Sequence, residues 1–333
     1  MRAKEVRMGR TAKFCIRGRT WAGLALMVAF VAPAAADCPP SLEGQVQQAA
    51  QLRAWTQDAA RPAAPFQRVA LSLADCLSSP DPALRDALGF ELLSAWMRAG
   101  RLTPETLRLL RDRWLSVLQA PPDAPGFHAP FAALALSEVA RVDRVQPFLQ
   151  PAEREALLVA GASWLRQWRD YRAHDDHEGW RHGVAHGADL LMQLALNPAV
   201  DADGAALMLA SLGAQVLAQG QVAYQHGEGE RLARAARFAL ARSAWSAEQV
   251  KAWLLTVLEP ARGGSWDARR LRLAHNARQF LWPLYVALQE QADAGLRERA
   301  LPAVRQALAS LDWPGQAARS RPQLLTTMAA MNS

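Results

Sequence analysis

Lysine is scarce in this chain of 333 residues, and after residue 36 it occurs once, at Lys251. The first 36 residues hold seven Lys or Arg and one Glu, a net charge of +6, whereas the whole chain carries +7. The remainder therefore has a net charge near +1 (7 − 6). A chain so close to neutral lacks the basic character typical of nucleic-acid binding, and we expect no nucleic-acid partner.

Alternating runs of apolar and polar residues, which are typical of half-buried strands, are also missing. The sequence has no phosphate-binding loop, no dinucleotide-binding fingerprint and no motif of a catalytic nucleophile. Apolar residues instead recur every three or four positions, as at Leu84, Leu88, Leu92 and Ala95. This spacing is typical of amphipathic helices, so we predict an all-α fold.

The N-terminus has the pattern of a secretory signal peptide. Basic residues precede a short apolar stretch from Trp21 to Val31, and Ala34 to Ala36 supply the small residues that a signal peptidase reads. The stretch is shorter than the roughly 20 residues of a membrane span, although an uncleaved anchor is the alternative. We predict a signal peptide over 1–36 and one mature domain over 37–333. That domain would be periplasmic or secreted, with no stable membrane span.

Two of the three cysteines, Cys38 and Cys76, belong to the predicted mature chain. In an oxidising compartment they could form a disulfide that ties the N-terminal arm to the first helices. The alternative is a pair of free thiols, because the sequence does not reveal whether the two residues lie close together.

The predicted helices form units of similar length. Their starts are expected near residues 81, 129, 179, 228 and 277. The predicted starts are about 49 residues apart. Units of this length with two helices each predict a HEAT-like α-solenoid of about five to six helix pairs. The alternative is an irregular helical bundle. Several tryptophans at helical spacing are expected to pack between the units: Trp96, Trp164, Trp168 and Trp253.

Residues 174–189 are chemically distinctive because they hold four of the seven histidines. We expect a loop up to Glu178 and a helix that starts near Trp180. On that helix, the spacings of four, three and four residues would place a set of polar side chains on one face. These are His182, His186, Asp189 and Gln193. Gly183 and Gly187 lack side chains, so a neighbouring helix could approach closely beside them.

This polar face has two interpretations. Two imidazoles four residues apart, with a carboxylate one turn on, could bind a divalent metal through His182, His186 and Asp189. Gly183 occupies the place where the zinc-protease motif has Glu, so that motif is absent. The other interpretation is a polar lining, hydrogen-bonded to adjacent helices or exposed as a binding surface without metal.

A second polar cluster could face the first. It consists of Tyr224, His226, Glu228, Glu230 and Arg231 at the start of the next unit. In a solenoid the starts of successive helices line the same edge, although an ordinary solvated loop is the alternative.

The remaining candidates are expected to cap helices or lie on the surface. His275, Asn276 and Arg278 would open the last long helix, and His128 would precede another.

The central stretch carries a resemblance to a known family. Gly179 through His182, followed by Ala185 through Leu190, resembles the signature of a bacterial domain of unknown function, number 2785. Two weaker matches are residues 229–233 and 276–285. The resemblance covers roughly residues 80–310 and implies a helical-repeat fold, with no established activity, cofactor or partner.

Two functions remain open on the sequence. The first is a binding or scaffold module for a protein, peptide or glycan, with a candidate site made of Trp180, His182, His186, Asp189, Glu230 and Arg231. The second is a hydrolase, with or without a divalent metal. In it His182 or His186 would act as the general base or metal ligand, Asp189 would orient it, and Glu178 or Glu230 would assist.

Overall fold

A computed structural model describes residues 38–42, 45–46, 48–58 and 60–311, all within one compact unit, Ala36–Ser333. The described residues form twelve α-helices, three short helical segments of other geometry and two small hairpins. The all-α prediction is confirmed. The predicted signal peptide lies outside the described residues.

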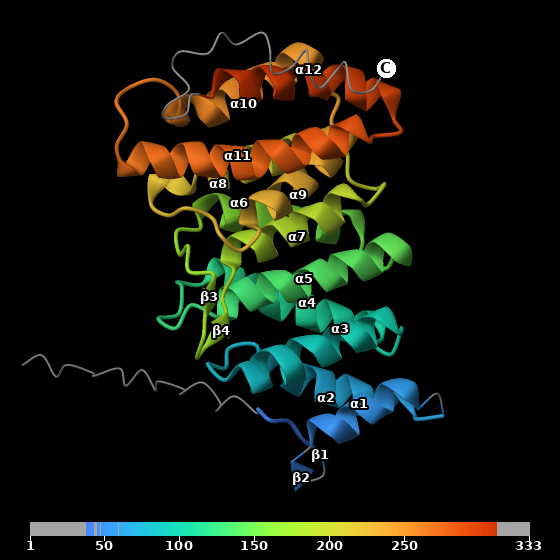
Figure 1. The fold of residues 1–333 in the computed structure, drawn as a ribbon. Helices are drawn as coiled ribbons and strands as arrows, with labels where there is room; N and C mark the ends of the chain where they lie inside the picture. The colour runs from blue at the N-terminus through green and yellow to red at the C-terminus, as the bar shows by residue number, and fades with distance from the viewer. Residues whose placement is uncertain (1–37, 43–44, 47, 59, 312–333) are drawn as a thin grey trace, which may run out of the picture. The chain divides into compact units, whose positions relative to one another are not determined.

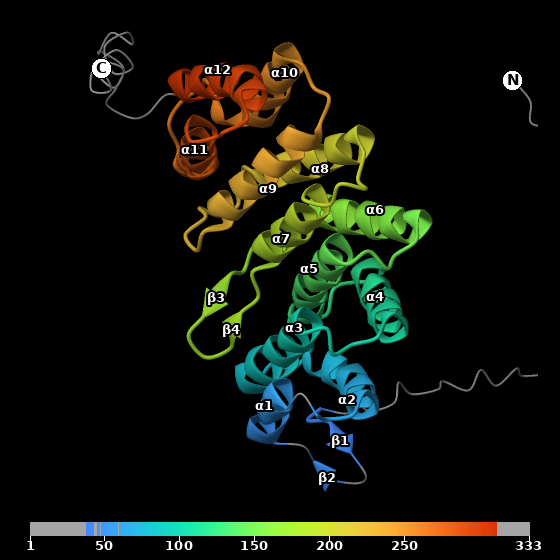
Figure 2. The same ribbon diagram turned by 90° about the vertical axis from the view of Figure 1, so that its right-hand side faces the viewer.

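The helices pack in two rows (Figures 1 and 2), within which each helix contacts the next of its row. The odd-numbered row consists of α1 (Ala49–Gln57), α3 (Glu91–Arg98), α5 (His128–Val145), α7 (Gly183–Ala195), α9 (Glu228–Arg242) and α11 (Ala268–Gln289). The even-numbered row consists of α2 (Ala63–Cys76), α4 (Pro104–Gln119), α6 (Pro151–Gln167), α8 (Ala202–Gln215), α10 (Ala247–Leu258) and α12 (Ala294–Ser310).

Five shorter elements complete the described fold. A π-helical stretch, Ala83–Phe90, runs directly into α3, and two 3-10 turns occupy Ala218–Gly220 and Glu259–Ala261. The antiparallel hairpins are β1 (Ser41–Leu42) with β2 (Gln45–Val46), and β3 (His174–Asp175) with β4 (Gly179–Trp180).

Local sequence signals account for many helix starts. Thr103 caps α4 through its side chain, and proline occupies the first turn of both α4 and α6. Four of the five predicted unit starts lie within four residues of an observed helical start. The prediction near residue 277 is wrong, because Asp267 caps α11 and starts it at Ala268. His275 and Asn276 therefore lie in the middle of that helix and do not open it.

The interior is lined by leucine, alanine and tryptophan from both rows. Trp96, Trp164 and Trp168 are buried, and Trp253 packs partly buried against the same core. Their predicted role as packing residues is confirmed. Among the described helices, none combines the length and apolar character that crossing a membrane requires.

A buried carboxylate joins three successive segments. Asp143 on α5 is 1% exposed and accepts hydrogen bonds from the backbone of Leu149, from Arg154 Nε at 2.7 Å and from Asn197 Nδ2 at 2.9 Å. Burial alone would raise its pKa, but these hydrogen bonds and the charge of Arg154 lower it below its usual value. Asp143 is therefore ionised at neutral pH and fixes α5 against α6 and the turn after α7.

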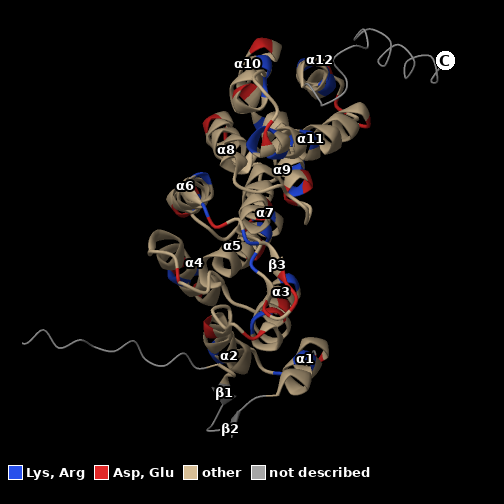
Figure 3. Cartoon of the chain, turned by 60° about the vertical axis from the view of Figure 1, so that its left-hand side comes forward, with Lys and Arg blue, Asp and Glu red and all other residues tan. Residues whose placement is uncertain are grey.

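Ion pairs also connect neighbouring helices of the odd row. Arg98 on α3 binds Glu138 on α5 at 2.6 Å, and Arg231 on α9 binds Asp189 on α7. Figure 3 shows acidic and basic residues interspersed along the helices.

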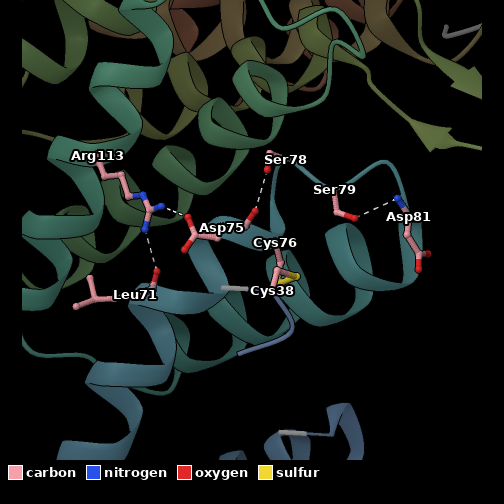
Figure 4. The surroundings of a disulfide bond; sticks show 8 residues. All are labelled: Cys38, Leu71, Asp75, Cys76, Ser78, Ser79, Asp81 and Arg113. Atoms are coloured by element: carbon pink, nitrogen blue, oxygen red, sulfur yellow. Dashed lines mark hydrogen bonds and ion pairs between the residues drawn. A yellow bond between two sulfur atoms is a disulfide. The ribbon is translucent and has the colours of Figure 1, made fainter. Parts of the chain in front are cut away.

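The two cysteines of the described chain form a disulfide (Figure 4). Cys38 and Cys76 have Cα atoms 5.1 Å apart and are separated by 38 residues in sequence. Beside them, Asp75 forms an ion pair with Arg113 on α4. The bond ties the segment before α1 to the end of α2. The predicted disulfide is therefore confirmed, and the alternative of two free thiols is wrong.

Candidate functional site

The predicted loop before α7 is a short hairpin, β3–β4. Asp175 Oδ1 accepts hydrogen bonds from the backbone N–H groups of His177 and Glu178, at 2.8 and 2.9 Å, which closes its turn. Gly179 follows with φ +73°, a conformation that favours glycine. Figure 2 shows the hairpin on the side of the odd-numbered helices, away from α4 and α6.

Two buried arginines anchor this hairpin. Arg85 donates to the backbone oxygen of Glu178 at 2.7 Å, and Arg181 donates to the side chain of Glu178 at 2.6 Å. Both guanidinium groups stack on the ring of Phe127, at 4.1 and 4.2 Å. Arg85 could not be predicted from the sequence, since a fully buried arginine on an apolar helix face has no distinctive pattern. The anchors fix the position of Trp180 over the start of α7.

His182 has an unusual backbone. It precedes α7 as its N-cap, with φ 53° and ψ 36°, a left-handed conformation that is uncommon for residues other than glycine. The helix that was expected to start near Trp180 begins three residues later, at Gly183, and Trp180 itself lies in β4. Trp180 stacks on the His182 ring at 4.8 Å.

The His182 side chain is 6% exposed. Burial, followed by the positive charge of Arg231, lowers its pKa from 6.5 to about 4. The imidazole is therefore neutral at neutral pH. Among the described residues its buried Nε2 has no hydrogen-bond partner.

Glu228 faces His182 from the first turn of α9. Its Oε1 lies 3.7 Å from His182 Nε2 and 4.0 Å from His226 Nδ1, while Oε2 accepts a hydrogen bond from the His226 backbone at 2.9 Å. The Glu228 side chain is 5% exposed. His226 also lies against the edge of Trp180, with ring centres 5.8 Å apart, and His174 contacts Trp180 at 4.6 Å.

His186 lies deeper than His182, with ring centres 5.7 Å apart. Its Nδ1 is 3.2 Å from the backbone oxygen of Pro130, and its ring packs edge-on against Phe131. Burial lowers the pKa of His186 well below its usual value. His186 therefore joins α7 to α5 as a neutral core residue.

Asp189 points toward Arg231 on α9 and forms an ion pair with it. Burial raises the pKa of Asp189, although Arg231 and Arg234 lower it in part. The hydrolase hypothesis had Asp189 orient a histidine, whereas its ion-pair partner is Arg231. Gln193 accepts from Arg144 at 3.4 Å.

The predicted polar face is thus divided among different partners. Among the residues that the structure describes, no three His, Cys, Asp or Glu side chains are arranged to hold a metal ion. The residues of the proposed metal set have different partners: His186 faces a carbonyl of α5 and Asp189 faces Arg231.

The two polar clusters do meet, as the stacking of successive helix starts predicted. Glu228 and His226 approach His182, and Arg231 approaches Asp189, whereas Glu230 is exposed. Tyr224 is buried and donates to the backbone oxygen of Gln215. The predicted close approach at the glycines is confirmed too. A Cβ on Gly183 would lie 2.4 Å from Trp168, and one on Gly187 would lie 2.7 Å from Leu165.

A narrow crevice opens beside this arrangement. About 150 Å³ of space lies outside the atoms here when the solvent at the open side is counted, and almost none of it is enclosed between the side chains. It is lined by Asp170, Tyr171, Arg172, His182, Gly183, Val184, Tyr224 and Glu228. The site is thus a buried imidazole and a buried carboxylate at a crevice, beside exposed rings of Trp180, His174 and His226.

Comparison with known proteins gives one match. Searches of curated proteins and of solved structures find nothing similar. Residues 116–286, about half of the chain, match the family described as "Protein of unknown function (DUF2785)". This range includes α7, the hairpin and the start of α9, and it is shorter than the expected 80–310. The chain therefore belongs to the family DUF2785.

Proposed function

We propose that this chain is an exported helical-repeat protein that binds a ligand where the β3–β4 hairpin and the starts of α7 and α9 meet. The ligand would be a protein, peptide or glycan of the cell envelope. Export is supported by the signal-like N-terminus and by the Cys38–Cys76 disulfide, which is typical of an oxidising compartment. A HEAT-like array is supported by the helix pairs, whose rows stack in sequence order.

The conformation of His182 carries the proposal. A left-handed backbone at a residue other than glycine costs on the order of 1–3 kcal/mol and persists where the surroundings enforce it, often at functional sites. Here it holds a buried imidazole nitrogen without a hydrogen-bond partner among the described residues. Buried polar atoms are normally satisfied. Strain and an unsatisfied nitrogen at one residue are expected where a ligand completes the site.

A photo-crosslinking experiment tests this function. A benzophenone amino acid would replace His177, an exposed residue in the hairpin turn, and in a control Leu109, which is 57% exposed on α4. Irradiation of intact cells, followed by mass spectrometry, should give an adduct from position 177 and none from position 109. The adduct should disappear when His182→Gln is added to a chain that still folds by circular dichroism.

Two results would contradict the proposal. One is the absence of any adduct from position 177. The other is an adduct that survives His182→Gln unchanged, because the hairpin would then contact the crosslinked molecule without any need for His182.

A second candidate is a hydrolase, favoured by the neutral His182 beside Glu228. An imidazole with a free nitrogen can take a proton from water, and a carboxylate 3.7 Å away can stabilise the resulting charge. Hydrolysis of a panel of ester and glycoside substrates, lost in both His182→Gln and Glu228→Gln, would favour the enzyme. Equal rates in wild type and variants would eliminate this candidate.

A further inference from the structure

We propose that the group bound at the His182–Glu228 crevice is a protonated primary amine; this inference rests on the binding function proposed above. The geometry points to it through three observations: the acceptors that face the crevice, the balance of charge around it, and the aromatic rings beside it.

Two polar atoms face each other here, His182 Nε2 and Glu228 Oε1. His182 is neutral at neutral pH, and its Nε2 lacks a hydrogen-bond partner among the described residues. Glu228 Oε1 lies 3.7 Å away, too far for a direct hydrogen bond. When the His182 ring proton is on Nδ1, both atoms are acceptors, and a donor between them would satisfy both. An ammonium group carries three N–H donors and no acceptor, so it can serve both.

The charge balance favours a cation over a neutral donor. Three arginines near the crevice pair with carboxylates other than Glu228: Arg172 binds Asp170, Arg181 binds Glu178, and Arg231 binds Asp189. Glu228 is different, because its ion-pair contacts within the described chain are with two histidines. A buried carboxylate without a cationic partner is costly, and a bound ammonium would offset that cost.

Aromatic rings flank the same place. Trp180 covers His182 and is 38% exposed, and Tyr171 and Tyr224 line the crevice. Ring faces attract cations, most strongly when both are shielded from water. A metal cation is the weaker alternative, since no three suitable ligands converge within the described residues.

The probe for this inference is n-butylamine, titrated at pH 7 in phosphate buffer, because Tris is itself a primary amine. The readout is the indole N–H resonance of Trp180, assigned by its loss in Trp180→Phe. The neutral and anionic comparison compounds, 1-butanol and butyrate, have similar chains. We expect butylammonium alone to shift the resonance in a saturable way.

Two glutamate substitutions test whether the Glu228 carboxylate binds the amine. Glu228→Gln should weaken the binding of butylammonium at least tenfold, while Glu105→Gln, in the first turn of α4, should leave it unchanged. Glu228→Gln keeps an oxygen for the His226 backbone, and circular dichroism would verify its fold. His182→Gln serves as a second variant and should also weaken binding.

Several outcomes would overturn the inference. These are binding of 1-butanol as tight as that of the amine, unchanged amine binding in Glu228→Gln, and no saturable shift. Each leaves the crosslinking test of the binding function intact. An adduct at position 177 together with no amine binding would refute the amine alone.

Discussion

The burial of His182 predicts how the stability of the protein depends on pH. The pKa of this imidazole is about 4 in the folded protein, against 6.5 for an unperturbed histidine, mainly because burial disfavours the charged form. Its side chain is 6% exposed, so solvent screens it little. The unfolded chain therefore binds a proton at this residue more readily than the folded protein does.

Proton linkage gives the direction and the size of this change in the free energy of unfolding. Because the pKa is lower in the folded state, the contribution of His182 to stability is fully present above about pH 6.5 and is lost as the pH falls toward 4. A shift of one pKa unit corresponds to about 1.4 kcal/mol. Between pH 7.5 and 4.5 the free energy of unfolding should therefore fall by about 2.5 kcal/mol through this residue alone.

The assay is urea unfolding followed by tryptophan fluorescence, at one-unit steps from pH 7.5 to 4.5, for wild type and His182→Gln. Titrating groups away from His182 act on both proteins and cancel in the difference, whereas His186 leaves a small difference because the charge of His182 also lowers its pKa. Wild type should lose about 2.5 kcal/mol more than His182→Gln over this range. Gln193→Ala, on the same helix, removes no titrating group and should follow the wild-type slope.

Parallel curves for wild type and His182→Gln would refute the reasoning. If wild type instead lost less stability than His182→Gln on acidification, the effect of His182 would have the opposite direction. It would mean that the charged imidazole forms an ion pair with Glu228 in the folded protein. That result would also remove the free acceptor on which the amine inference depends.

Three further predictions concern the fold. Cys38→Ser, or reduction of wild type, should lower the free energy of unfolding by about 4 kcal/mol, since the bond to Cys76 spans 38 residues; denaturant unfolding with and without reductant checks this. Asp143→Ala should cost about 3–5 kcal/mol, because it leaves a buried arginine unpaired; thermal melts that match wild type would contradict it. Gly183→Ala should destabilise by about 1–3 kcal/mol through its clash with Trp168, despite a better helix propensity; a higher melting temperature would contradict this packing.

Helices could be predicted well from the sequence because their signals are local. Periodic leucine and alanine residues act within one or two turns, and four of the five predicted unit starts lie within four residues of an observed helical start. The error at α11 arose because its start was expected from the regular interval between units, whereas Asp267 caps the helix and starts it at Ala268.

The site was predicted less well because its geometry is not local. A helical projection placed His182, His186 and Asp189 on one face, yet the left-handed backbone at His182 turns that residue out of the helix. No neighbouring residue indicates this conformation. It accompanies the hairpin that Arg85 and Arg181 hold against Phe127, and Arg85 lies 97 positions before His182 in the sequence.

The meeting of the two polar clusters was predictable for a different reason. Neighbouring helices of the odd row run in the same direction, since His182 faces Glu228 near the starts of α7 and α9 while Arg242, at the end of α9, binds the carbonyl of Ala195, at the end of α7. With one helix of similar length, α8, between them, such helices begin at the same edge, so polar residues at both starts become neighbours. Topology thus gives the proximity of the clusters. The pairing within them, Glu228 with histidine and Arg231 with Asp189, depends on side-chain lengths and burial, and these became apparent only once α7 and α9 were packed together.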